Sequence, residues 1–142
     1  MLSNLSLTRL FNSIKKNPFR FVHLPLILYW IFLFIMTSIP VEKIPKLFNT
    51  QDKIEHFAAY FILGVLIKLS TVFQNKSELI KKNSMIVSLI IITIYAMFDE
   101  LHQLIIPGRY CDFYDWLFDF VGGSAGIILV NHFLKRDKSL VH

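Results

Sequence analysis

The 142-residue sequence has one cysteine, Cys111, so an internal disulfide is excluded. Charged residues make up only 18%, whereas soluble domains carry about a quarter. No internal repeat or low-complexity segment occurs, and a single domain is the natural count for this length. No serine or cysteine stands in an obvious nucleophile motif, which disfavours acyl-enzyme chemistry. What remains is a strongly apolar chain, 54% hydrophobic with 14 Phe.

The apolar residues are gathered in four long stretches. The stretch at 21–41 contains no Asp, Glu, Lys or Arg, and at about 1.5 Å a residue it crosses the roughly 30 Å hydrocarbon layer. The second stretch contains Glu55, His56 and Lys68, but these lie near its ends, where they can reach the membrane interface. We therefore predict an all-α membrane domain over residues 21–135, a bundle of four transmembrane helices at about 21–41, 54–73, 84–106 and 114–134.

Basic residues are distributed unequally between the two sides of this bundle. The N-terminal tail, the connection after the second helix and the C-terminal tail hold 11 of the 15 Lys and Arg, whereas the other side holds 8 of the 10 acids. By the positive-inside rule, residues 1–20 and 136–142 are cytoplasmic tails of a multi-pass cell-membrane protein. The tail at 1–20 is either a short amphipathic helix on the membrane surface or a flexible segment. A cleaved signal peptide is the alternative, but the apolar stretch is too long and Thr37-Ser38-Ile39-Pro40 is no cleavage pattern.

Ionisable residues are concentrated at the predicted outer ends of three helices. On the second helix Asp52, His56 and Tyr60 share one face, with Lys53 beside them. The third carries Asp99-Glu100-Leu101-His102-Gln103, the fourth carries Asp115 and Asp119, and Pro107-Gly108 forms a turn that presents Arg109. Asp52, Asp112 and Asp115 lie near helix N-termini, where capping alone would explain a carboxylate.

Glu100 and Asp119 are less easily explained by capping. A carboxylate well inside a span costs about 2.5–3.5 kcal/mol on insertion scales, so it normally faces the bundle interior or a wet cavity. We therefore predict that Glu100 and Asp119, on different helices at similar depth, share one polar pocket. Gly122-x-x-x-Gly126 lets a neighbouring helix approach closely, and we expect it to draw the fourth helix against the second or third.

At these residues the sequence resembles the VanZ-like family of small bacterial membrane proteins. The matching elements are Asp52-Lys53-x-x-His56-x-x-x-Tyr60-x-x-Leu63-Gly64, Asp99-Glu100-x-His102-Gln103-x-x-x-Pro107-Gly108-Arg109 and Asp115-x-x-x-Asp119-x-x-Gly122-x-x-x-Gly126. The resemblance implies a multispan protein of the cell envelope; the name-giving member is associated with resistance to the glycopeptide teicoplanin. The family often has Asn where this chain has Asp119, so a role for that position does not transfer directly.

Two hypotheses for function follow. In the first, the pocket recognises a cell-envelope or lipid-linked molecule, through Lys53, Tyr60, Asp99, His102, Gln103, Arg109, Asp115 and Asp119. In the second, the protein is an enzyme that uses His56 and Glu100 as an acid/base pair on an envelope substrate, while Lys53 and Arg109 hold an anionic group.

His56, Glu100, His102 and Asp119 are residue types that bind zinc, but they lack a compact signature such as H-E-x-x-H, and we predict no metal and no cofactor. The expected partners are the lipid bilayer and an envelope lipid or glycopeptide-related ligand, with no nucleic acid. The Gly122–Gly126 face leaves homo-oligomerisation open.

Overall fold

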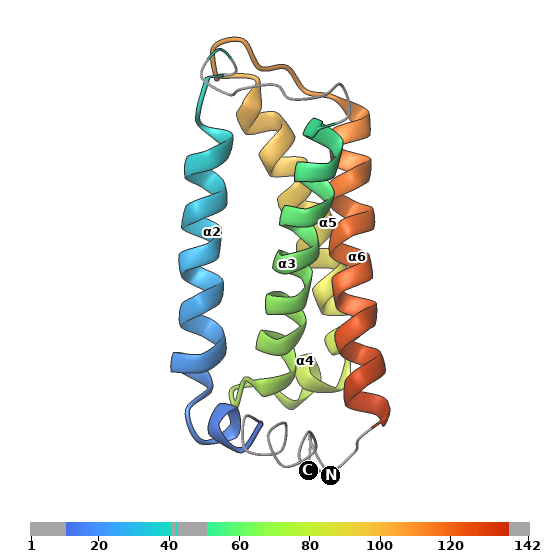
Figure 1. The fold of residues 1–142 in the computed structure, drawn as a ribbon. Helices are drawn as coiled ribbons and strands as arrows, with labels where there is room; N and C mark the ends of the chain where they lie inside the picture. The colour runs from blue at the N-terminus through green and yellow to red at the C-terminus, as the bar shows by residue number, and fades with distance from the viewer. Residues whose placement is uncertain (1–10, 41, 43–50, 137–142) are drawn as a thin grey trace.

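The protein is described by a computed structural model that covers residues 11–40, 42 and 51–136. Within these residues the chain is helical and contains no strand: η1 (Phe19–His23) continues into α2 (Leu24–Thr37), followed by α3 (Gln51–Phe73), α4 (Glu78–Lys82), α5 (Ser84–Gln103) and α6 (Phe113–Arg136). Figure 1 shows α2, α3, α5 and α6 as a long bundle, with short α4 across one end. Four helical stretches, Phe19–Thr37, Gln51–Phe73, Ser84–Gln103 and Phe113–Arg136, are long and apolar enough to cross a membrane. The predicted all-α bundle of four transmembrane helices is confirmed.

The helices end where the local sequence stops supporting helical hydrogen bonds. The Ser38 hydroxyl donates to the Phe34 carbonyl at 2.6 Å, and Pro40 disfavours further helix in the residue before it. α5 ends at Gln103, three residues before the predicted boundary, because the turn at Pro107-Gly108 follows and Gly108 has a φ of 75°. Asp112 begins α6 by accepting the Tyr114 backbone N–H at 2.8 Å.

α5 shows the inverted polarity that a lipid environment imposes. Its buried face consists mainly of polar residues and small residues, whereas large apolar side chains cover the opposite face and are exposed. In water this helix would place its apolar face inward; between lipid tails, polar groups gain by turning to the bundle interior. The buried residues are Ser84, Ser88, Ile92, Ala96, Asp99, Glu100 and Gln103, and the exposed ones include Ile86, Ile90, Ile94, Met97 and Leu101.

α3 and α6 approach each other at backbone distance through glycines. A Cβ added to Gly122 would lie 2.3 Å from the Phe57 carbonyl oxygen, and one on Gly126 would lie 2.2 Å from that of Phe61. Gly64 makes the reciprocal contact, since its Cβ would lie 2.1 Å from the Gly123 carbonyl oxygen. Such close packing is the use that membrane helices make of small residues. Gly122-x-x-x-Gly126 thus packs α6 against α3, one of the two partners that the sequence left open.

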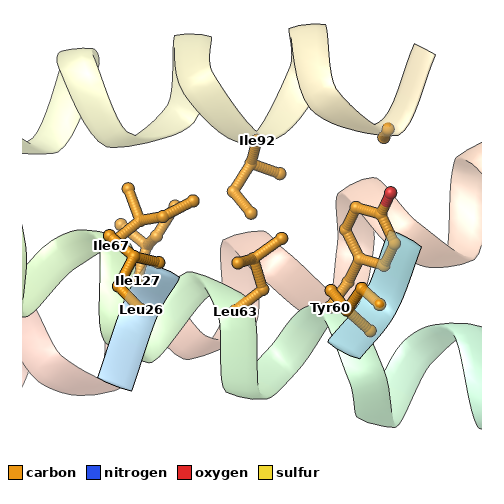
Figure 2. Close-up of a cluster of buried hydrophobic side chains, with 8 residues drawn as sticks. Leu26, Tyr60, Leu63, Ile67, Ile92 and Ile127 are labelled. Atoms are coloured by element: carbon orange, nitrogen blue, oxygen red, sulfur yellow. The ribbon is translucent and has the colours of Figure 1, made fainter. Parts of the chain in front are cut away.

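The apolar core lies midway along the bundle and involves all four long helices. Figure 2 shows Ile92 of α5 directed toward Leu63 of α3, with Ile67 of α3 and Ile127 of α6 beside them. Tyr60 lies at one end of this cluster and is 2% exposed.

The segment before the first span also packs on the bundle. Residues 11–16 are helical, and Ile14 is buried in a second apolar cluster with Val72, Phe73 and Leu134. Residues 1–10, where the rest of the predicted tail falls, lie outside the described residues.

Candidate functional site

The predicted polar residues lie at the end of the bundle where α2 and α5 finish and α3 and α6 begin. We call this the acidic end, and it comprises Lys53, His56, Asp99, Glu100, Asp112, Asp115 and Asp119. Glu100 is 2% exposed and Asp119 is 0% exposed, so both carboxylates face the interior and not the lipid. Short contacts from three helices and the α5–α6 loop hold the group together.

His56 and Asp119 form a pair between α3 and α6. The Nδ1 atom of His56 lies 2.8 Å from Oδ1 of Asp119, so a protonated Nδ1 donates to the carboxylate. The other ring nitrogen, Nε2, lies 3.8 Å from Asp52 and 4.0 Å from Asp115, toward the outer rim of the bundle. The second oxygen of Asp119, Oδ2, is buried and has no hydrogen-bond partner among the described residues.

Lys53 connects the first turn of α3 to the start of α6. Its Nζ atom donates to Asp112 Oδ2 at 2.7 Å and also to Asp115 Oδ1, and it lies 3.6 Å from the more exposed Asp52. The hydrogen bond from Lys53, together with the Tyr114 backbone N–H, lowers the pKa of Asp112, which lies in the loop just before α6. This lysine is therefore fully engaged with carboxylates.

Glu100 and Gln103 link α5 to the loop that follows it. Oε2 of Glu100 accepts the Asp112 backbone N–H at 2.9 Å, and Oε1 accepts a long 3.5 Å bond from Gln103 Nε2. Gln103 in turn accepts from Nη1 of Arg109 at 3.2 Å. Arg109 also donates from Nε to the Ile39 carbonyl at 2.9 Å and from Nη2 to the Met36 carbonyl at 3.2 Å. In this arrangement Arg109 ties the loop to the end of α2.

The remaining predicted residues differ in how closely they join the group. Asp99 is buried near Tyr60, which is itself only 2% exposed and belongs to the apolar core, so Asp99 is the member of the acidic end that adjoins that core. His102 turns toward α2, where its ring stacks on Phe34 with centroids 4.6 Å apart. His102 therefore lies apart from the His56–Asp119 pair, although it belongs to the same sequence motif as Glu100.

Asp112 is the residue that the sequence-based site omitted. It bonds to Lys53 through its side chain and to Glu100 through its backbone, and so joins two halves of the group. Its place before a helix made capping a sufficient explanation, and that capping bond is also present. The sequence signal that could have placed Asp112 in the site was the turn at Pro107-Gly108, which directs the chain back over the ends of α5 and α3.

The acidic end also has the geometry of a candidate cation site. His56, Glu100 and Asp119 each offer one donor atom, and these atoms lie within 4.8 Å of one another; Asp52, His56 and Asp115 form a second such group. One nitrogen and two carboxylate ligands suit zinc and other divalent ions. The same three groups can equally accept hydrogen bonds from an ammonium group.

The chain matches the VanZ/LLP1 family over residues 4–135, which is nearly its whole length. No curated protein and no solved structure matches it.

Proposed function

The chain belongs to the VanZ/LLP1 family and is a multi-pass membrane protein, and we propose that its acidic end recognises a positively charged or hydrogen-bond-donating part of a cell-envelope or lipid-linked molecule. The observation that carries this proposal is the unpartnered Oδ2 of Asp119, fully buried beside His56 and Glu100. A buried acceptor without a donor costs about 1–3 kcal/mol, so a ligand that supplies the donor is favoured there.

The balance of charge at the acidic end sets the sign of the ligand. Lys53 is paired with Asp112 and Asp115, which leaves Asp99, Glu100 and Asp119 with two histidines nearby: His56, and His102 on the side of Asp99. Carboxylates therefore exceed cations in the interior of the group. A ligand that brings an amine or another cationic group would complement this excess.

An anionic ligand has less support than the sequence hypothesis gave it. That hypothesis assigned anion binding to Lys53 and Arg109, but the first is bonded to two carboxylates and the second to Gln103 and two backbone carbonyls. We assign both residues to positioning the α5–α6 loop and α6 around the site. A glycopeptide-related ligand of the teicoplanin type, which the family resemblance implies, would bind to the acidic end through its amino groups.

The proposal is tested by identifying what co-purifies with the full-length protein. Gently extracted wild type and Asp119→Asn are compared by native mass spectrometry, with Glu78→Gln as a matched control, because it removes one acid at the opposite end, where Glu78 is 90% exposed. We expect an organic amine-bearing species on wild type and on Glu78→Gln, and its loss from Asp119→Asn. Equal occupancy of all three proteins, or a bound divalent metal ion in place of an organic ligand, would refute recognition of such a molecule.

An enzymatic role is the second candidate, and one specific observation favours it. His56 is oriented by the Asp119 carboxylate at Nδ1 while Nε2 points toward the rim, which is the arrangement of a base held by a carboxylate. The partner of His56 is Asp119, whereas the sequence hypothesis paired it with Glu100. Incubation of a total membrane-lipid extract with wild type and with His56→Gln distinguishes the two roles. A lipid consumed only by wild type would support catalysis, and unchanged lipid profiles would leave recognition as the only one of the two roles supported.

We also propose that both termini are cytoplasmic and that the acidic end faces outward, as the distribution of Lys and Arg predicts. The exposed Cys111, the only cysteine, lies at the acidic end and reports on this directly. Desolvation and the nearby Glu100 raise the pKa of the Cys111 thiol, so its labelling at neutral pH will be slower than that of a free cysteine. A membrane-impermeant maleimide should label Cys111 in intact cells. Labelling of Cys111 only after permeabilisation would show that the orientation is the reverse of the proposed one. Cys111→Ser carrying Lys76→Cys is the control for the opposite side.

A further inference from the structure

The opposite end of the bundle contains an open-sided cavity of about 170 Å³, large enough for several water molecules. Its lining residues lie near the end of α3, in α4, at the start of α5 and near the end of α6. Figure 1 shows these segments together at one end of the bundle. Four separate helices contribute polar groups to its wall: Lys68, Lys81, Ser84, Asn131 and Lys135. We call this group the basic end.

Lys68 is the central residue of the basic end. It lies within α3, five residues before the last, and is 2% exposed. Its Nζ atom donates to Ser84 Oγ at 2.8 Å, and no carboxylate in the described part of the chain forms an ion pair with it. An ammonium group has three donors, so this contact leaves two of them for another acceptor. A charged residue in a membrane helix normally has a partner, and its isolation indicates a ligand.

The other cavity residues determine which kind of ligand fits. Lys81 and Lys135 add two further positive charges, and Asn131 adds an amide that can donate. Within residues 51–136, the one acid that pairs with a lysine of this group is Glu78, which lies 3.9 Å from Lys81 and is 90% exposed, so it screens only the outer edge. Three ammonium groups around one cavity favour a compact anion with several acceptor oxygens, for which lysine acts as a point charge.

We propose that the basic end binds a phosphate group, carried by an anionic phospholipid headgroup or present as free phosphate. The cavity lies at the ends of helices long enough to cross a membrane, which is where a spanning bundle would meet lipid headgroups, and Val72 and Leu134 give it an apolar side. This site is separate from the acidic end and does not depend on the function proposed there.

The test compares two adjacent lysines of α4 in the full-length protein. Lys81 lines the cavity, whereas Lys82 is exposed and does not, so Lys81→Gln and Lys82→Gln remove the same charge at neighbouring positions. Thermal unfolding in detergent is followed during titration with phosphatidylglycerol, with phosphatidylcholine, and with inorganic phosphate against sodium chloride of equal ionic strength. Stabilisation by phosphatidylglycerol alone identifies a lipid site, and stabilisation by inorganic phosphate identifies a soluble anion.

The expected result is a selective effect of the cavity-lining lysine. Lys81→Gln should weaken the apparent affinity about fivefold, the effect of one lysine near a charged surface, and Lys82→Gln should change it far less. Equal weakening by both variants would mean diffuse surface attraction and would overturn the site, as would the absence of stabilisation by either ligand.

Lys68→Met separates a ligand-binding lysine from a structural one. We expect it to lose the response to ligand while the unliganded protein unfolds at no lower temperature, since the buried charge has no partner carboxylate. A lower unfolding temperature without ligand would show that Lys68 is structural and would contradict the proposal. If Lys68→Met does not fold, Lys81→Gln and Lys135→Gln decide the question.

Discussion

Lys53 and Lys68 lie at opposite ends of the same helix, α3, and their surroundings differ sharply. Lys53 is held by Asp112 and Asp115, with Asp52 close by, whereas the Lys68 ammonium group has one hydrogen bond among the described residues, to the Ser84 hydroxyl at 2.8 Å. One lysine therefore completes a network and the other leaves donors free. Within one bundle, the same side chain holds the protein together at the acidic end and, on our proposal, receives a ligand at the basic end.

The two ends also differ in how the chain is connected around them. At the acidic end the α5–α6 loop is bonded to α5 through Glu100 and to the end of α2 through Arg109. At the basic end the polar side chains surround a cavity and, among the described residues, only Lys81 has an acidic partner there. Replacing a residue that bonds to other protein groups, such as Lys53, costs stability in the unliganded protein, whereas a residue that lines the cavity can be replaced at little cost until the ligand is added.

The largest effect is expected from separating the two helices that carry the acidic end. Gly122→Val would place a side chain against the Phe57 carbonyl, next to His56, and should destabilise the protein by about 3 kcal/mol. Thermal unfolding in detergent measures this, with Val121→Ala as the control, because Val121 is exposed on the lipid-facing side. Wild-type stability in Gly122→Val would mean that α3 and α6 do not approach as closely as described.

Substituting the two lysines tests the comparison itself. Lys53→Met leaves Asp112 and Asp115 without their cation and should cost about 2 kcal/mol, less than the roughly 3–5 kcal/mol of a fully buried pair because Lys53 is partly exposed. Lys68→Met should cost nothing in the absence of ligand. Chemical unfolding of both variants side by side gives the difference; equal losses would remove the distinction between the two ends.

A smaller effect, dependent on pH, is expected from Asp112. Its pKa is lowered by Lys53, so the pair stabilises the folded protein fully above the unfolded pKa of about 3.9, and this contribution is lost as the pH falls through the folded pKa. Asp112→Asn should lower stability by about 1 kcal/mol at pH 7, and the difference from wild type should shrink below pH about 4. A difference that stays constant across that range would show that Asp112 acts through its size and not its charge.

The sequence was sufficient for the fold because the bilayer imposes simple rules on it. Long uncharged stretches predict spans, and the buried Glu100 and Asp119 follow from the cost of placing carboxylates in lipid. Gly122 and Gly126 predicted close packing, but the choice of α3 as partner depends on the matching Gly64. The contact of Gly64 with the Gly123 backbone can be recognised only in the folded structure.

Partners within the site were harder to predict than its members. The α5–α6 loop turns back over the bundle and brings Asp112 to Lys53, and no spacing rule connects residues so far apart in the chain. Arg109 was expected to face a ligand, yet it reaches backbone carbonyls of α2 and the residues after it, groups that carry no sequence signal. His102 shares a motif with Glu100 but stacks on Phe34, because side chains two positions apart on an α-helix point about 200° away from each other.

The acidic end acts as one site only if His56 of α3 and Asp119 of α6 are energetically coupled through their 2.8 Å contact. A double-mutant cycle with His56→Gln and Asp119→Asn, followed by unfolding in detergent at neutral pH, measures that coupling directly. We predict an interaction energy of about 1 kcal/mol or more. Additive effects of the two substitutions would contradict the shared site.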